Sequence, residues 1–476
     1  MNLQKVDKPF HFLIFGASGD LAKLKLFPAL YELAFQKRFR GAYTITGFAR
    51  SAMSQNDFHR LITESIRKKY GKKTNAAALR ELLAHCQYQQ GQYDHPRDFK
   101  ALGEALRRKH HEKIETLAYL ATPPSVFKSI VEHLAGLRAV LGHKMKIILE
   151  KPFGEDEKSA TELFHFISQY FSEEQVYLLD HYLGKTPVQS ILPLRTSNTV
   201  LNVLLQGKQI ANIQINALEE VGVGDRIGYF ESVGILKDMI QSHLLQMLSL
   251  ITMSIPIQQT PKAIKREKMH ILSALRYGDK DCAIVLGQYK SYAKEKGVRP
   301  GSRTPTFAAL RTHIDLAEWY EVPIYLRTGK RLNHRHAYIV VEFKKPAFNR
   351  DQALAANQLV IELAPEENIQ IHLLDARGNR MQTHREVVSA ESLACTGDDC
   401  LPEHGRLILD VFRSDHTFFV SFEEIIASWQ FIDRVVRRIT KDKIKVHPYA
   451  DYSQGPDAQN ALTACDGFQW YDADHL

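Results

Sequence analysis

The sequence has no long apolar run, few cysteines and no dense block of charge of one sign. None of its 476 residues falls in an apolar stretch of about 18 or more, and the N-terminus lacks the apolar core and cleavage site of a secretory leader. We therefore expect a cytoplasmic protein without a membrane partner. The five cysteines are an odd number at scattered spacing, which is typical of a reducing compartment.

Metal and nucleic-acid sites are also poorly supported. Cys395 and Cys400 are the one close cysteine pair, and no histidine follows them at zinc-site spacing, so we expect a surface loop there and no metal. The net charge is +8, but the basic residues are spread out and no aromatic residues alternate with them, so no nucleic-acid partner is expected. A basic protein does suit small anionic substrates.

The length favours two domains. From residue 11 to about 185, short β-rich runs such as "HFLIFG", "YTITGFAR" and "MKIILEKPFG" alternate with helical patterns. Several of these runs are apolar throughout, as parallel strands covered on both faces are. The pattern predicts an α/β, Rossmann-like, doubly wound domain over residues 1–185.

Residues 186–476 show a different pattern. After residue 208, "QIANIQINALEE", "VPIYLRTG", "AYIVVEF", "QLVIELA", "NIQIHLLDA" and "HTFFVSF" alternate apolar and polar residues, as half-buried antiparallel strands do. A long helical segment is predicted over residues 234–253. We expect a larger α+β domain with a mainly antiparallel sheet, which binds substrate and forms a homodimer or homotetramer through a sheet face.

The stretch "FLIFGASGD" at residues 12–20 resembles a phosphate-binding loop. Gly16 and Gly19 allow backbone N–H groups to approach a pyrophosphate at a helix N-terminus. A strand-to-helix turn without a ligand is an equally good interpretation of this loop taken alone.

The second strand favours NADP over NAD. An NAD-binding fold places a carboxylate near the end of that strand to bond the ribose 2′-hydroxyl, whereas "TITGFAR" ends in Arg50. An arginine can bind a 2′-phosphate through two parallel hydrogen bonds, and Lys25 could add a second cation. A solvent-facing arginine at a strand end is the simpler alternative.

Six motifs, in order along nearly the whole chain, together resemble the glucose-6-phosphate dehydrogenase family. They are "GASGDLAK" (16–23), "EKPFG" (150–154), "DHYLGK" (180–185), "GYFESVGILKDMIQSHLLQML" (228–248), "VPIYLRTGKRLNHR" (322–335) and "YSQGP" (452–456). The resemblance implies an enzyme that oxidises D-glucose 6-phosphate with NADP to 6-phosphoglucono-δ-lactone, the first step of the pentose phosphate pathway.

The resemblance also implies roles for individual residues. His243 is the expected general base, since an imidazole with a pKa near 6.5 can accept the proton of the sugar C1 hydroxyl, and Asp180 is the expected carboxylate partner that orients it. The substrate would be bound by His181, Tyr182, Lys185, Glu219, Asp238, Lys330 and Arg335. The cofactor would be bound by Gly16, Ser18, Gly19, Asp20, Leu21, Lys25, Arg50, Lys151 and Pro152.

The sequence departs from the family pattern at several positions. Leu178 and Thr186 replace the usual residues around "DHYLGK", and His404 and Gly405 stand where the family has Tyr-Glu. None of these changes removes an expected catalytic residue. Two alternatives stay open: a catalytically silent regulatory relative, and a sugar oxidoreductase of the broader group that shares "EKP" and acts on an unphosphorylated sugar.

Overall fold

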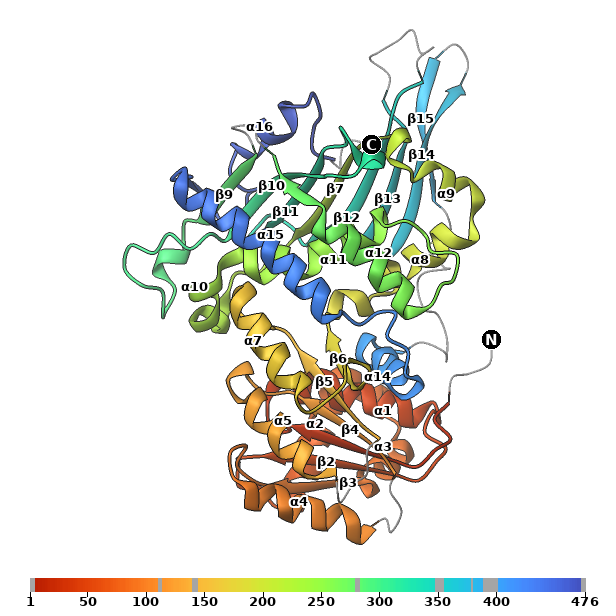
Figure 1. Ribbon diagram of the computed structural model, residues 1–476, viewed down its shortest axis with the longest axis vertical. Helices are drawn as coiled ribbons and strands as arrows, with labels where there is room; N and C mark the ends of the chain where they lie inside the picture. The colour runs from red at the N-terminus through yellow and green to blue at the C-terminus, as the bar shows by residue number, and fades with distance from the viewer. Residues whose placement is uncertain are drawn as a thin grey trace. The chain divides into compact units, whose positions relative to one another are not determined.

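The computed structural model describes residues 5–109, 114–138, 144–278, 283–346, 355–377, 380–387 and 401–471. The chain forms two compact units, and the main boundary between them follows Gly184 (Figure 1). The division differs from the expected ranges because residues 401–422, far along the chain, belong to the first unit. The surface loop expected at Cys395 and Cys400 lies outside the described residues.

The first unit contains a six-stranded, fully parallel sheet in the order β3-β2-β1-β4-β5-β6. Its strands are β1 (Phe10–Phe15), β2 (Tyr43–Ala49), β3 (Cys86–Gln90), β4 (Glu115–Leu120), β5 (Met145–Glu150) and β6 (Val176–Leu179). This is the strand order of the Rossmann fold, in which the order reverses between β1 and β4. The prediction of a doubly wound α/β domain is confirmed.

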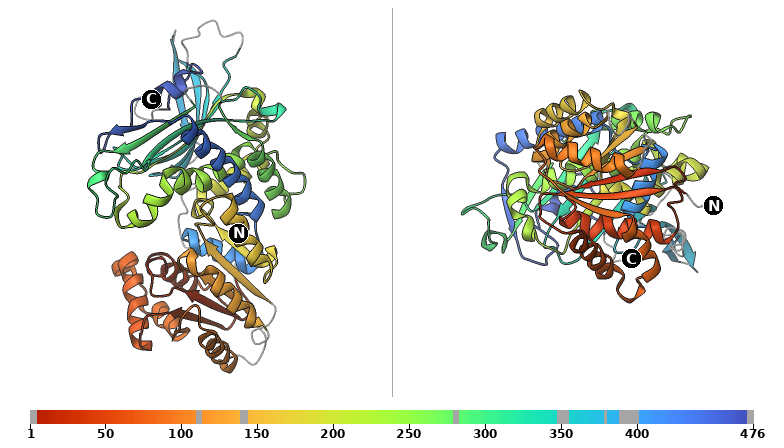
Figure 2. Two further views of the ribbon diagram at one scale, coloured as in Figure 1. Left: turned by 60° about the vertical axis from the view of Figure 1, so that its left-hand side comes forward. Right: turned by 90° about the horizontal axis from the view of Figure 1, so that it is seen from below.

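Helices cover both faces of this sheet, which explains why most of its strands are mainly apolar (Figure 2). On β1, alternate residues serve opposite faces: Phe12 belongs to the core beneath the first helices, while the Phe15 ring stacks on Phe99 at 5.7 Å. The helices of this unit are η1 (Ala22–Leu26), α1 (Phe27–Phe35), α2 (Gln55–Tyr70), α3 (Ala76–Ala84), α4 (Pro96–Lys109), α5 (Phe127–Gly136), α7 (Glu157–Ser168) and α14 (Glu403–Arg413).

The second unit contains a ten-stranded sheet that is mainly antiparallel. Its main path is β15-β14-β13-β12-β7-β11-β10-β9-β16, with β8 beside β10 and with parallel pairing only at β7–β11 and β9–β16 among the described strands. The strands are β7 (Ile210–Leu218), β8 (Leu275–Tyr277), β9 (Ile284–Tyr289), β10 (Phe307–Ile314), β11 (Ile324–Gly329), β12 (His336–Phe343), β13 (Gln358–Ala364), β14 (Asn368–Arg377), β15 (Arg380–Val387) and β16 (Val446–Tyr449).

Helices of the second unit pack beside this sheet (Figure 1). They are α8 (Thr186–Ser197), α9 (Thr199–Leu204), α10 (Ile227–Ile235), η8 (Leu236–Leu244), α11 (Leu245–Thr252), α12 (Pro261–Ser273), α15 (Phe422–Lys441) and α16 (Gln459–Ala464). No helix in the described ranges combines the length and apolarity needed to cross a bilayer. The predicted helix over 234–253 is present, but its middle part, η8, has π-helical geometry.

Two expectations from the sequence are corrected. The run "HTFFVSF" at 416–422 is not a strand of the second sheet: it forms turns in the first unit, with a single bridge between Val420 and Leu178. Its apolar residues pack on β6 instead, where Tyr177 stacks on His416 at 4.0 Å. In addition, Cys465 is disulfide-bonded, contrary to what the cysteine count suggested, whereas Cys86 is a free, buried thiol.

Candidate active site

The turn after β1 has the geometry of a phosphate-binding loop. Gly16 has a φ of 83°, and a Cβ atom there would lie 2.3 Å from the carbonyl oxygen of Ala121, so only glycine fits. The Gly19 amide donates to the Gly16 carbonyl at 2.9 Å, which closes the turn. The loop lies beside the strand-order reversal, where doubly wound sheets bind nucleotides.

The first helix begins directly from this loop. Its first hydrogen bond runs from the Lys23 amide to the Gly19 carbonyl, so the amides of Asp20, Leu21 and Ala22 have no acceptor within the helix. Such a helix end suits a pyrophosphate, because its N–H groups and dipole both favour negative charge. The dinucleotide therefore fits the residues present.

Arg50 follows the last residue of β2. Its side chain is exposed, and its guanidinium carbon lies 5.7 Å from the centre of the Tyr93 ring. Burial raises the pKa of Tyr93, and the charge of Arg50 opposes that rise. Ser18 of the loop contacts Ser51 through their hydroxyl groups at 3.1 Å, so the loop and the end of β2 adjoin.

The carboxyl end of β5 carries the "EKP" residues. Glu150 accepts a hydrogen bond from the hydroxyl of Tyr119, and His404 Nε2 lies 3.2 Å from Glu150 Oε1. His404, one of the departures from the family pattern, thus helps to hold the residue that precedes Lys151. Lys151 and Pro152 are partly buried and joined by a cis peptide bond.

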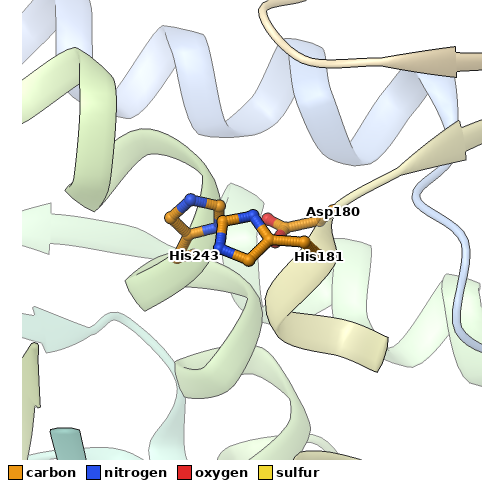
Figure 3. Close-up of side chains that lie close together, drawn as sticks. All are labelled: Asp180, His181 and His243. Carbon is orange, nitrogen blue, oxygen red and sulfur yellow. The ribbon is translucent and has the colours of Figure 1, made fainter. Parts of the chain in front are cut away.

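Asp180 and His181 come from the carboxyl end of β6 (Figure 3). Asp180 is 2% exposed, and its Oδ1 accepts a hydrogen bond from the Tyr182 amide at 3.0 Å. His181 and Tyr182 lie in a single helical turn, η5 (His181–Gly184), with ring centres 4.9 Å apart. The "DHYLGK" run therefore folds as a tight turn that fixes the Asp180 carboxylate.

A partly buried cluster of opposite charges lies at one edge of the second sheet. Because β7 and β11 are parallel, Glu219 and Lys330 follow their strands at the same edge. Lys330 Nζ bonds a carboxylate oxygen of Glu219 and lies 3.7 Å from Asp238 Oδ2. Arg226 Nη2 donates to the other oxygen of Asp238 at 3.3 Å. Three of the residues expected to bind substrate are thus brought together.

The π-helical segment η8 carries both Asp238 and His243. His243 is drawn in Figure 3. In an α-helix, residues five apart point about 140° away from each other. A π-helix closes its hydrogen bonds between residues five apart, as from the Leu245 amide to the Ile240 carbonyl, so Asp238 and His243 share one face. Both side chains are buried, at 2% and 1% exposure.

Three other expected residues lie outside these contacts. Lys185 is buried, and its ammonium group donates to the Leu363 carbonyl at 3.3 Å. Arg335 and Lys25 are exposed, and neither side chain forms an ion pair within the described ranges. Exposure leaves them able to reach a bound anion.

Sequence reasoning missed Arg226 and Tyr93. Arg226 lies twelve residues before Asp238 in an unremarkable turn, and only the fold brings the two together. Tyr93 packs on Arg50 although 43 positions separate them. An aromatic residue just after the third strand was the one available signal for Tyr93.

Comparison with known proteins agrees with this architecture. Residues 13–190 match the family model described as glucose-6-phosphate dehydrogenase, NAD binding domain, and residues 192–471 match the one described as its C-terminal domain. The chain belongs to the glucose-6-phosphate dehydrogenase family. It is therefore an oxidoreductase whose first unit binds a nicotinamide dinucleotide, as the loop after β1 indicates.

Similar proteins match nearly the whole chain. A cytoplasmic glucose-6-phosphate 1-dehydrogenase of Arabidopsis thaliana is 36% identical over 96% of this chain and 91% of its own length. The enzyme of Rhizobium meliloti is 33% identical over 98% of both chains. A solved glucose-6-phosphate dehydrogenase in complex with glucose 6-phosphate is 31% identical, with a TM-score of 0.89 over 98% of this chain and 99% of that one.

Proposed function

We propose that the protein oxidises D-glucose 6-phosphate at C1 to 6-phosphoglucono-δ-lactone, the first step of the pentose phosphate pathway, with NADP⁺ as hydride acceptor. The observation that carries the proposal is the charged cluster of Glu219, Asp238 and Lys330, with His243 on the same helix face as Asp238. The solved relative bound to glucose 6-phosphate supports the choice of substrate.

His243 is the proposed general base. Loss of the C1 hydrogen as hydride leaves a developing carbonyl, so the C1 hydroxyl must release its proton, and a neutral imidazole can accept it. Asp180 would accept a hydrogen bond from the other ring nitrogen and stabilise the imidazolium. The bond from the Tyr182 amide to Asp180 supports this role, because it fixes the carboxylate.

The substrate is proposed to be bound at both ends. Its phosphate would be bound by His181, Tyr182 and Lys185, because cations and hydrogen-bond donors placed together stabilise a dianion. Glu219 and Asp238 would accept hydrogen bonds from sugar hydroxyls, while Lys330 and Arg335 would supply further positive charge. A sugar without a phosphate would offer His181, Tyr182 and Lys185 no dianion to bind.

The cofactor is proposed to be NADP. Bound NADP⁺ supplies the acceptor for the hydride. Gly16, Ser18, Gly19, Asp20 and Leu21 would hold its pyrophosphate. Arg50 and Lys25 would face the 2′-phosphate, and Lys151 and Pro152 would line the nicotinamide side.

The test is to mix purified protein with NADP⁺ and glucose 6-phosphate, follow NADPH absorbance, and compare wild type with His243→Asn. Loss of the base is expected to lower kcat by about 10²–10⁴-fold with little change in substrate affinity. Glucose in place of glucose 6-phosphate is the substrate control. Nucleotide binding without turnover by the wild type would instead favour a regulatory relative.

Assembly and location complete the proposal. We expect a homodimer or homotetramer, which light scattering of the purified protein would measure. We also expect cytoplasmic residence; similar proteins include both cytoplasmic and chloroplastic ones, so this expectation rests on the sequence.

A further inference from the structure

A cavity of about 550 Å³ lies in the second unit beside β9 and the edge strand β16, and cationic side chains surround it. Lys290 follows β9, Arg303 lies in the loop before β10, and Lys443 and Lys445 lie between α15 and β16. A cationic helix C-terminus would account for Lys443 alone. It does not account for cations that converge from three separate segments.

The four cations have no counter-ion within the described part of the chain. Among the residues that the structure describes, none of the four forms an ion pair, and no carboxylate lines the cavity. The nearest acids in sequence are engaged elsewhere: Asp442 pairs with Arg438, and Asp451 pairs with Arg331. Like charges placed around one cavity repel each other, and a bound anion would remove that repulsion.

The rim of the cavity is held in place by hydrogen bonds. The Gln288 side chain donates to the carbonyls of Ser302 and Thr304, at 3.0 and 3.1 Å, and so fixes the loop that carries Arg303. Lys443 adopts a left-handed conformation with a φ of 51° at the end of α15. Glycine is the usual residue in such a cap, so the lysine is conformationally unfavourable there. A fixed rim reduces the ordering that binding requires.

We propose that this cavity binds a small organic molecule that carries at least two phosphate groups. Arg303 can bind a phosphate through paired hydrogen bonds, and the three lysines supply point charges. Ile444 and Val446 give the cavity an apolar side against which an organic group can pack. The volume falls in the usual range of small-molecule sites. No residue proposed for the substrate or cofactor lines this cavity.

The test is isothermal titration calorimetry of the full chain with ATP and with inorganic tripolyphosphate, at about 0.15 M salt. Lys290→Gln/Arg303→Gln is expected to weaken ATP binding at least tenfold while keeping wild-type kcat. Lys443→Gly is a second variant, since it removes a charge and suits the left-handed conformation. ATP should bind more tightly than tripolyphosphate if the apolar side contacts the nucleoside.

Two controls separate this site from other sources of binding. Lys208→Gln/Lys262→Gln removes the same charge from exposed lysines outside the cavity and should change affinity less than twofold. Lys185→Gln, in the proposed phosphate site of the substrate, should also leave ATP binding nearly unchanged. Absence of binding to wild type, equal weakening by both double variants, or loss of binding in Lys185→Gln would overturn the proposal. Equal affinity for ATP and tripolyphosphate would overturn the claim that the ligand is an organic molecule.

Discussion

Replacement of Arg50 by glutamine tests how the protein distinguishes the two nicotinamide dinucleotides. The guanidinium is exposed, forms no ion pair in the described part of the chain, and lies over the Tyr93 ring at 5.7 Å. Its donors are therefore available to a 2′-phosphate, while the ring restricts the side chain. Hydrogen bonds to charged groups contribute about 1.5–3 kcal/mol, and about 1.4 kcal/mol corresponds to a factor of ten.

Arg50→Gln should therefore raise KM for NADP⁺ about tenfold to hundredfold, with solvent screening favouring the lower figure. KM for NAD⁺ should change less than twofold, because NAD⁺ has no 2′-phosphate, and kcat should hold. Initial rates at varied NADP⁺ and NAD⁺ measure these changes, and Arg67→Gln, on the exposed part of α2, is the matched control. An equal rise in KM for both cofactors would refute the assigned role.

Two further predictions concern stability. Lys268 and Glu424 form a fully buried ion pair at 2.6 Å, so Lys268→Met should lower the free energy of unfolding in urea by about 3–5 kcal/mol, and Lys268→Met/Glu424→Leu should restore most of it. Equal stability of the two variants would contradict this. Burial raises the pKa of Asp410 from 3.8 to about 7, so its contribution is full below about pH 4 and is lost as pH rises through about 7. Asp410→Asn should therefore gain stability relative to wild type between pH 4 and 8, whereas a constant difference across that range would argue against the shift.

Local patterns were enough to predict the first unit. Five of its six strands are mainly apolar runs between helical patterns, and both faces of the sheet are covered, so burial and sequence agree along them. The sixth, the edge strand β3, is polar and only partly buried. The same reasoning failed at 416–422, whose apolar residues also alternate. That segment buries them on β6, about 240 positions earlier, and no local period distinguishes this partner from a neighbouring strand.

The charged sites show the same limit in another form. Glu219 and Lys330 were predicted from motifs, but their pairing depends on β7 and β11 being parallel neighbours within an otherwise mostly antiparallel sheet. The basic cavity was not predicted at all, because its cations are spread from residue 290 to residue 445. Cations that are far apart in the sequence form one site only because the fold brings their segments together.

The geometry of η8 explains why helical periodicity could not have joined Asp238 to His243. At 3.6 residues per turn, Asp238 and His243 lie on different faces of a helix. The sequence of η8 contains no residue pattern that predicts a π-helix. π-helical segments are uncommon, but those that occur are frequently at functional sites. The segment η1, directly after the nucleotide loop, is a second π-helix in this protein. Deleting one residue of η8 between Asp238 and His243 would favour return to α-helical bonding with the two still on one face, four residues apart. Because the shorter segment would rotate everything after it, activity should be lost even though the pair is preserved, and a shortened variant with wild-type kcat would show that the π-helical bonds are dispensable.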